Sequence, residues 1–229
     1  MHNPVFCALD TPDLREAKHL ANLLAGQIGG VKLGLEFFMA QGHAGVAQVR
    51  PAHLPLFLDV KLHDIPNTVA GALSSLLPLA PDFVTIHAGG GEAMMMAARD
   101  VAAQAEKPLK LLGVTVLTSL DSDDLAGVGQ DRDMRAQVTR LAKLAQAAGL
   151  DGVICAPSEI AALRAACGSD FILMVPGIRP TWAASNDQKR VLTPREAMQA
   201  GATHLVIGRP ITAAPDPLAA AEKIQAELA

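Results

Sequence analysis

Short apolar runs alternate with longer amphipathic stretches from one end of the chain to the other. The runs have the length and composition of strands buried in a parallel sheet, and turn-forming residues separate them from the stretches that follow. We therefore expect strands at Val5–Leu9, Gly30–Leu33, Leu56–Lys61, Phe83–His87, Leu111–Leu117, Gly152–Cys155, Phe171–Val175 and Leu205–Ile207.

The stretches between these runs have helical spacing. Apolar residues stand at positions 14, 17, 20, 21 and 24 of Asp13–Leu24, which places them on one face of a helix. Arg135–Ala148 and Pro157–Ala166 are similar, and Asp216–Leu228 is expected to form the last helix. Eight strands, each followed by a helix, predict an α/β fold: a single (β/α)8 TIM barrel that forms one domain over residues 1–229.

A doubly wound parallel sheet is the alternative architecture for this alternation. It would need fewer strands, and it usually carries a glycine-rich dinucleotide turn after the first strand. The first expected strand here is followed by Asp10, Thr11 and Pro12 instead. The length of 229 residues is also near the roughly 250 that are typical of a one-domain barrel.

Composition narrows the function. Half of the residues are hydrophobic and 18% are charged, which excludes a disordered chain. The net charge of −4 and the aromatic content of 3% argue against nucleic-acid binding, because neither a cationic surface nor stacking side chains are available. A small phosphorylated substrate remains possible, since it requires only local cations and backbone amides.

Three cysteines, Cys7, Cys155 and Cys167, stand far apart in the sequence. Their spacing indicates buried thiols in a reducing compartment rather than a disulfide framework or a metal site. The first residues lack the pattern of a signal peptide, and the longest apolar runs are far below the about 18 residues of a membrane helix. We expect a cytoplasmic protein that has no membrane partner and no metal site.

Charged residues gather where the expected strands end, which is where a barrel of this kind places its active site. Asp59 and Lys61 are two positions apart and would share one strand face, toward the barrel mouth. Lys32 on the neighbouring strand and Asp64 just beyond would extend them into a chain of alternating charge. A structural ion-pair network at the rim is the alternative, but burying several charges is expensive and clustered charges are typical of proton-transfer sites.

Gly208 and Arg209 follow the last expected strand and indicate a phosphate site. Loops after strands seven and eight of such barrels commonly bind phosphate; glycine permits close backbone approach, and arginine offers two parallel donors. A turn followed by a surface charge is the alternative. The polar stretch Gly177–Arg190 is long for a barrel loop and is either functional or a surface insertion. Other polar residues at strand ends are Asp10, His87, Thr118, Ser119 and Arg179.

The segment Asp59–Thr68 reads DVKLHDIPNT and resembles the active-site signature of orotidine 5′-phosphate decarboxylases, which is DxKxxDIPNT in bacterial members. DxKxxD alone is shared by a wider barrel superfamily, but its combination with the remaining matches is specific. The further matches occur in the same order as in that family and are Ala8–Asp10, Val31–Gly34, Thr115–Ser119, Pro176–Pro180 and Val206–Pro210.

The resemblance implies a conversion of orotidine 5′-phosphate to UMP and CO2 without metal or cofactor, by a homodimer. It implies that Lys61 protonates C6 and that Asp59, Lys32 and Asp64 complete the charged catalytic group, with Asp64 supplied to the partner's site. Asp10 would bind a ribose hydroxyl, Thr118 the pyrimidine, and Gln188 would bridge the phosphate and the base. The full set of implied substrate-binding residues is Asp10, Lys32, Ile65, Thr68, Thr118, Pro176, Arg179, Gln188, Gly208 and Arg209.

Two other functions compete with this one. A sugar-phosphate decarboxylase or lyase of the same superfamily would share DxKxxD and the phosphate end but would use Mg²⁺. The run DIPNT, the segment PGIRP and Gln188 favour the orotidine 5′-phosphate reaction. A non-catalytic nucleotide-binding barrel would be expected to lack Lys61 or one of its carboxylates, and all are present.

Overall fold

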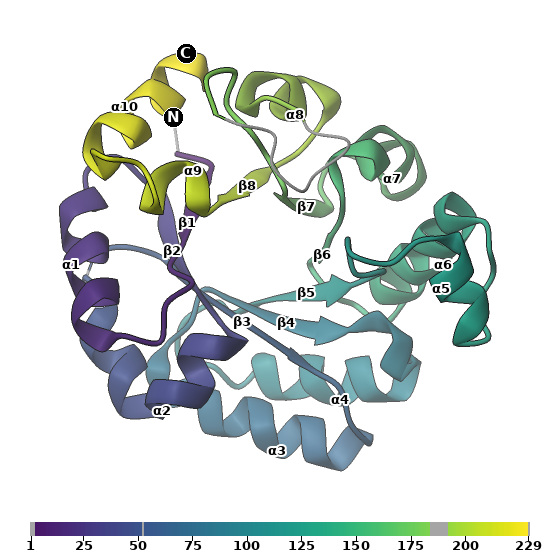
Figure 1. Ribbon diagram of the computed structural model, residues 1–229. Coiled ribbons are helices and arrows are strands. Elements are labelled where there is room, and N and C mark those ends of the chain that lie inside the picture. The colour runs from purple at the N-terminus through teal and green to yellow at the C-terminus, as the bar shows by residue number, and fades with distance from the viewer. Residues whose placement is uncertain (1–2, 52, 184–191, 229) are drawn as a thin grey trace.

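The chain forms a closed barrel of parallel strands wrapped by helices (Figure 1). A computed structural model describes residues 3–51, 53–183 and 192–228. Within these residues, eight strands pair in chain order, and the last pairs with the first to close the ring. The expected (β/α)8 barrel is therefore confirmed, and the doubly wound alternative is wrong.

The strands lie close to the ranges expected from the sequence. Their bounds are β1 (Val5–Ala8), β2 (Gly30–Gly34), β3 (Leu56–Leu62), β4 (Phe83–His87), β5 (Lys110–Val114), β6 (Gly152–Ile154), β7 (Ile172–Pro176) and β8 (His204–Ile207). The largest difference is in β5, which was expected to continue to Leu117. Beyond Val114 the chain turns away: the Thr115 hydroxyl donates to the Ile154 carbonyl, 3.1 Å away, and the Leu120 amide donates to the Leu117 carbonyl.

Helices form the outer layer, and several begin at a residue whose side chain accepts hydrogen bonds from the first turn. None of those in the described ranges combines the length and apolarity needed to span a bilayer. The α-helices are α1 (Leu14–Leu24), α2 (Leu35–Val49), α3 (Pro66–Leu76), α4 (Glu92–Ala102), α5 (Ser122–Gly127), α6 (Met134–Ala147), α7 (Ile160–Cys167), α8 (Pro194–Ala200), α9 (Arg209–Thr212) and α10 (Pro217–Leu228). Short 3₁₀ turns are η1 (Leu77–Leu79), η2 (Ala88–Gly90) and η3 (Pro157–Glu159).

The core has two parts. The larger part lies between the strands and the helices and is built from the outward-facing strand residues and the apolar helix faces. The smaller part fills the barrel itself, and we call it the barrel floor: Phe6, Phe57, Phe83, Leu112 and Met174. The rings of Phe6 and Phe83 pack edge to face, with centroids 5.4 Å apart. The floor closes the barrel interior below the mouth, so polar groups at the strand ends stand on an apolar base.

Strand β3 is irregular where it reaches the mouth. Leu58 pairs with Val84 of β4, and Leu62 pairs with Ile86, so four residue steps on β3 oppose two on β4. Two extra residues are therefore accommodated in a bulge, and Lys61 adopts a left-handed backbone with φ of 49°. Simple strand alternation was expected to bring Lys61 and Asp59 to one face. They do come together, but the bulge shapes the backbone that brings them there.

Candidate active site

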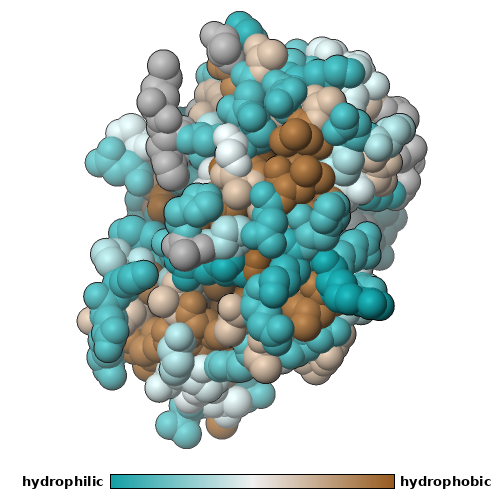
Figure 2. Space-filling view, turned by 90° about the vertical axis from the view of Figure 1, so that its left-hand side faces the viewer, coloured by the Kyte–Doolittle hydropathy of each residue, from teal (hydrophilic) through white to brown (hydrophobic). Residues whose placement is uncertain are grey.

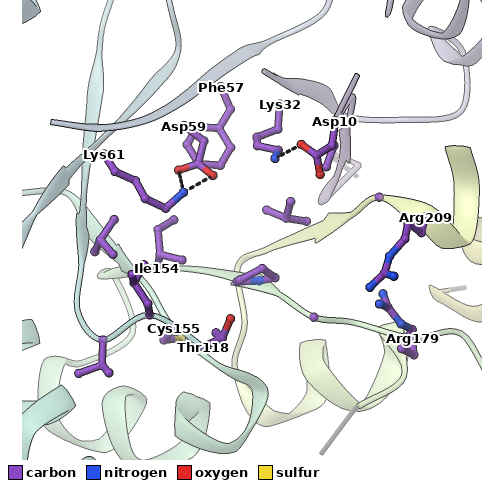
Figure 3. A pocket seen from close by; sticks show the side chains of 18 residues that line it. Asp10, Lys32, Phe57, Asp59, Lys61, Thr118, Ile154, Cys155, Arg179 and Arg209 are labelled. Atoms are coloured by element: carbon purple, nitrogen blue, oxygen red, sulfur yellow. Dashed lines mark hydrogen bonds and ion pairs between the residues drawn. The ribbon is translucent and has the colours of Figure 1, made fainter. Parts of the chain in front are cut away.

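A cavity of about 280 Å³ opens at the carboxyl ends of the strands (Figure 3). This is the end of a barrel at which ligands bind. Charged side chains from several strand ends line the cavity, together with apolar side chains that include Phe57 of the barrel floor. Its lining is Ala8, Asp10, Lys32, Phe57, Asp59, Lys61, Val114, Val116, Leu117, Thr118, Ile154, Cys155, Pro176, Gly177, Arg179, Val206, Gly208 and Arg209.

Lys61 and Asp59 form the ion pair on the β3 side of the cavity. The Lys61 ammonium donates to both Asp59 carboxylate oxygens, at 2.8 Å each. The Asp59 side chain is 16% exposed and the Lys61 side chain 32% exposed, so the ammonium keeps open access to the cavity. An ammonium fixed by a carboxylate and facing an apolar floor is suited to holding a positive charge beside a bound ligand.

Thr85 on β4 was not expected at the site, and it touches both members of this pair. Its hydroxyl accepts a hydrogen bond from the Lys61 amide at 2.9 Å and donates one to an Asp59 oxygen at 3.0 Å. The side chain is fully buried. The sequence did contain a signal for it. Strand β4 reads FVTIH, and Thr85 stands two positions after Phe83, so both side chains point toward the barrel interior.

A second ion pair lies across the mouth, between β1 and β2. The buried Lys32 ammonium contacts the Asp10 carboxylate at 2.6 Å. Gly34 leaves room for it, because a methyl group at that position would stand 3.2 Å from the Lys32 nitrogen. The charges of the described mouth are thus arranged as two pairs, Asp10–Lys32 and Asp59–Lys61, and not as the single chain that was expected.

Arg179 and Arg209 supply the cationic side of the cavity. Their guanidinium groups point toward one another, on the side away from Lys61 (Figure 3). Gly177, with φ of 79°, turns the chain after β7 so that Arg179 enters the cavity, where it is buried. Gly208 precedes Arg209 and leaves a bare backbone at the same wall. This pair of cations beside glycine backbone can bind a dianionic group such as phosphate.

The remaining wall is largely apolar. Val114, Val116 and Leu117 come from β5 and the segment after it, and Thr118 adds a hydroxyl to the cavity lining. Cys155 also faces the cavity, and burial raises the pKa of its thiol far above the ordinary range. A neutral thiol contributes packing rather than nucleophilic chemistry. Largely apolar side chains therefore line the cavity between its two charged ends.

Some residues assigned from the sequence do not line this cavity. Asp64, Ile65 and Thr68 are exposed at the rim, and the Asp64 carboxylate accepts a hydrogen bond from the Ile65 amide at 2.6 Å. Gln188 lies outside the described residues, as does the whole second half, residues 184–190, of the Gly177–Arg190 loop.

His87, at the end of β4, stacks on His63 with ring centroids 5.1 Å apart. Burial lowers the pKa of His87 below its ordinary value of 6.5, and the nearby His63 and Lys61 act in the same direction. The shift favours the neutral form of His87 beside the Lys61 charge. Among the described side chains there is no cluster of three His, Cys, Asp or Glu arranged to hold a metal ion.

The fold and the cavity together define the class of protein: a parallel α/β barrel with a small-molecule site at its mouth, cationic at one end and with a lysine–aspartate pair at the other. Residues 3–224 match the sequence model of the "Orotidine 5'-phosphate decarboxylase / HUMPS family". The chain belongs to that family.

Named relatives match over nearly the whole chain. An orotidine 5′-phosphate decarboxylase of Rhodospirillum rubrum is 55% identical, over 99% of this chain and 94% of that protein. One of Novosphingobium aromaticivorans is 53% identical over all of both chains. The crystal structure of orotidine 5′-phosphate decarboxylase from Lactobacillus acidophilus superposes with a TM-score of 0.83 at 37% identity, covering 99% of each chain.

Proposed function

We propose that this protein decarboxylates orotidine 5′-phosphate, giving UMP and CO2 in pyrimidine biosynthesis, without a metal ion or cofactor. The observation that carries the proposal is the position of the Lys61 ammonium. It is held by Asp59 at one end of an apolar cavity whose other end carries Arg179 and Arg209. Family membership and relatives of that name support the assignment.

In this proposal the bond between C6 and the carboxylate breaks, CO2 leaves, and the electron pair stays on C6. The Lys61 ammonium stabilises that developing charge and then transfers its proton to C6, so that UMP forms; water restores the proton to Lys61. Asp59 keeps the ammonium oriented through its two contacts of 2.8 Å. Lys32, bound to Asp10, contributes a second cation to the same mouth.

The other cavity residues bind the substrate. The cavity residues Arg179, Gly208 and Arg209 bind the phosphate. The Asp10 carboxylate accepts a hydrogen bond from a ribose hydroxyl, and Thr118 contacts the pyrimidine. Pro176 forms part of the cavity wall beside them. Gln188, which lies outside the described residues, is proposed to bridge the phosphate and the base. Phosphate binding, distant from C6, provides energy that organises the charged groups around the reacting atom.

The test is direct. Loss of orotidine 5′-phosphate absorbance is followed after adding purified protein, in buffer with excess EDTA and in buffer with Mg²⁺. Equal decarboxylation rates in both buffers support the proposal. No loss of absorbance in either buffer refutes the reaction, and loss only with Mg²⁺ refutes the metal-free mechanism in favour of the chemistry of sugar-phosphate relatives.

We further propose a homodimer in which each site receives Asp64, Ile65 and Thr68 from the partner. All three are exposed beside the mouth, and Ile65 is 66% exposed, unusual for so large an apolar side chain. Apolar residues also collect in patches on the face that carries α1 and α2 (Figure 2), where Leu35 and Met39 of α2 are 52% and 77% exposed. Such surfaces mark association sites.

Subunit mixing tests the shared site. Homodimers of Lys61→Ala and of Asp64→Ala should each be nearly inactive. After subunit exchange, about half of the dimers are mixed and one of their two sites is intact, so roughly a quarter of all sites should recover. If exchange is demonstrated with tagged subunits and no activity returns, Asp64 acts within its own chain.

The cytoplasm is the proposed location. Cys7, Cys155 and Cys167 are unbonded thiols in the described structure, and all are buried. Free thiols of this kind are typical of a reducing compartment. Fractionation of cells, with activity measured in each fraction, tests the assignment.

A further inference from the structure

Thr85 contacts both members of the Asp59–Lys61 pair, yet no sequence motif assigned it a role. It lies on β4 directly opposite the bulge of β3, where Leu58 and Leu62 pair with Val84 and Ile86 on either side of it. Its side chain has no exposure to solvent. A buried hydroxyl must find partners, and here both partners belong to the proposed catalytic pair.

The two hydrogen bonds of this hydroxyl have different consequences. As acceptor, it binds the amide of Lys61, a residue whose backbone is held at φ of 49° in the left-handed region. That conformation is unfavourable for a non-glycine residue and persists only where surrounding contacts impose it. As donor, the hydroxyl binds the Asp59 oxygen Oδ1, which also receives the Lys61 ammonium.

One hydroxyl therefore connects the backbone of the lysine to the carboxylate that orients the same lysine's ammonium. Lys61 is thus held at two points, at its backbone amide by Thr85 and at its side-chain ammonium by Asp59. A proton donor must stand within hydrogen-bond reach of the atom it protonates, and small misplacements strongly reduce rate.

We infer that Thr85 is a positioning residue for the decarboxylation: its hydroxyl holds the β3 bulge and the Asp59 carboxylate so that the Lys61 ammonium faces the reacting carbon. The inference rests on the proposed function. Thr85 itself does not line the cavity and is not assigned a contact with the substrate.

Thr85→Val is the first test, because valine keeps the shape and removes the hydroxyl. It leaves the Lys61 amide without its acceptor and Asp59 without one donor. We expect kcat to fall at least about tenfold, equivalent to roughly 1.4 kcal/mol of barrier. KM and the calorimetric affinity for UMP should stay within about threefold, since phosphate and ring contacts are untouched and uniform binding is retained.

Thr85→Ser keeps the hydroxyl and should restore kcat to within about threefold of wild type. Thr203→Val is the matched control. The Thr203 hydroxyl also accepts from a backbone amide and donates to a neighbouring oxygen, here the amide and the carbonyl of Leu173 in β7, but it lies just before β8 at the opposite end of the barrel. This variant should lose stability without losing kcat.

Three outcomes would overturn or refute the role proposed for Thr85. A fall in kcat of less than about tenfold for Thr85→Val, or a Thr85→Ser enzyme as slow as the valine variant, overturns the inference. Equal losses of kcat and UMP affinity also overturn it, because they show a general distortion of the cavity. A wild-type protein with no decarboxylase activity refutes the proposed function itself, so the two failures are distinguishable.

If Thr85→Val does not fold, Thr85→Ala is compared with Thr85→Ser. These two variants lose the same methyl group and differ only in the hydroxyl. The same difference of about tenfold in kcat is expected between them, and its absence refutes the positioning role.

Discussion

The mouth and the floor of the barrel are built from the same strands but follow opposite rules. On β3, Phe57 faces the floor, and Asp59 and Lys61 follow at the mouth; on β4, Phe83 is followed by Thr85. The floor rings are at most 8% exposed and pack edge to face. The mouth holds two ion pairs and a left-handed lysine. On each of these strands, moving two residues along leads from a side chain of the apolar floor to a polar side chain at the mouth.

This difference teaches where stability and activity reside. Burying aromatic rings against one another stabilises the folded state, whereas partly buried ion pairs add little net stability because desolvation offsets their attraction. A left-handed lysine is destabilising as well. We therefore expect substitutions at the mouth to remove activity from a protein that stays folded, and substitutions in the floor to unfold a protein whose remaining folded molecules stay active.

Lys61→Ala gives the largest expected effect at the mouth. Removing the proposed proton donor should lower kcat by more than about 1000-fold, because both charge stabilisation and proton transfer are lost. UMP binding and the thermal midpoint should change little. Stopped assays with concentrated enzyme and calorimetry measure these quantities. A variant that keeps more than about a tenth of wild-type kcat contradicts the role of Lys61.

Phe6→Ala is the corresponding change in the floor. Phe6 is fully buried, contacts the rings of Phe57, Phe83 and His204, and does not line the cavity. The variant should lose about 3–5 kcal/mol of unfolding free energy, as deletion of a buried ring usually does. Denaturant unfolding measures the loss, and kcat per folded molecule should remain near wild type. A stable but inactive variant would mean that the floor shapes the site directly.

Arg209→Ala tests the cationic end of the mouth. A lost charge-assisted contact of about 1.5–3 kcal/mol corresponds to a fall in kcat/KM of roughly 10- to 150-fold. We expect KM to rise and kcat to fall, because phosphate binding also organises the reacting end. A substrate analogue lacking the phosphate should be equally poor with both proteins. If the variant discriminates against that analogue as strongly as wild type, Arg209 does not bind the phosphate.

The smallest effect concerns pH. Burial lowers the pKa of His87 below 6.5, so the unfolded chain binds this proton at a higher pH than the folded chain. Stability is therefore unaffected well above pH 6.5 and falls as pH decreases from 6.5 toward the lowered folded value. Thermal midpoints of wild type and His87→Gln, measured across this range, should show the shallower acid loss in the variant. Parallel curves would exclude His87 as a source of acid sensitivity.

Much of this architecture was predictable from sequence because parallel barrels have simple patterns. Each strand is an apolar run, and each helix carries an apolar face. Eight such strand–helix units in succession predicted a closed barrel with the strands in chain order. The approach of Asp10, Lys32, Asp59 and Lys61 to one mouth also followed, since strand ends meet there. Arg179 and Arg209 reach the same cavity for the same reason.

The role of Thr85 and the partner of Lys32 were not predicted, because both depend on strand register and on contacts between residues far apart in the sequence. Thr85 is an ordinary strand residue until the bulge of β3 brings the Lys61 amide and the Asp59 carboxylate to its hydroxyl. Lys32 was expected to join Asp59 of the neighbouring strand β3, but Asp10 follows β1 on its other side. Three-dimensional distance selects Asp10.

Closure of the ring has a consequence for the order of events in folding. Val5 of β1 pairs with Leu205 of β8, a contact between segments at opposite ends of the described chain, and such distant pairings form slowly because a long loop must close first. The cavity takes Asp10 from just after β1 and Arg209 from just after β8. A refolding molecule thus has no complete ligand site until β1 and β8 have paired. UMP binding should therefore return no earlier than this pairing, so its time course gives the latest time by which β1 and β8 have joined.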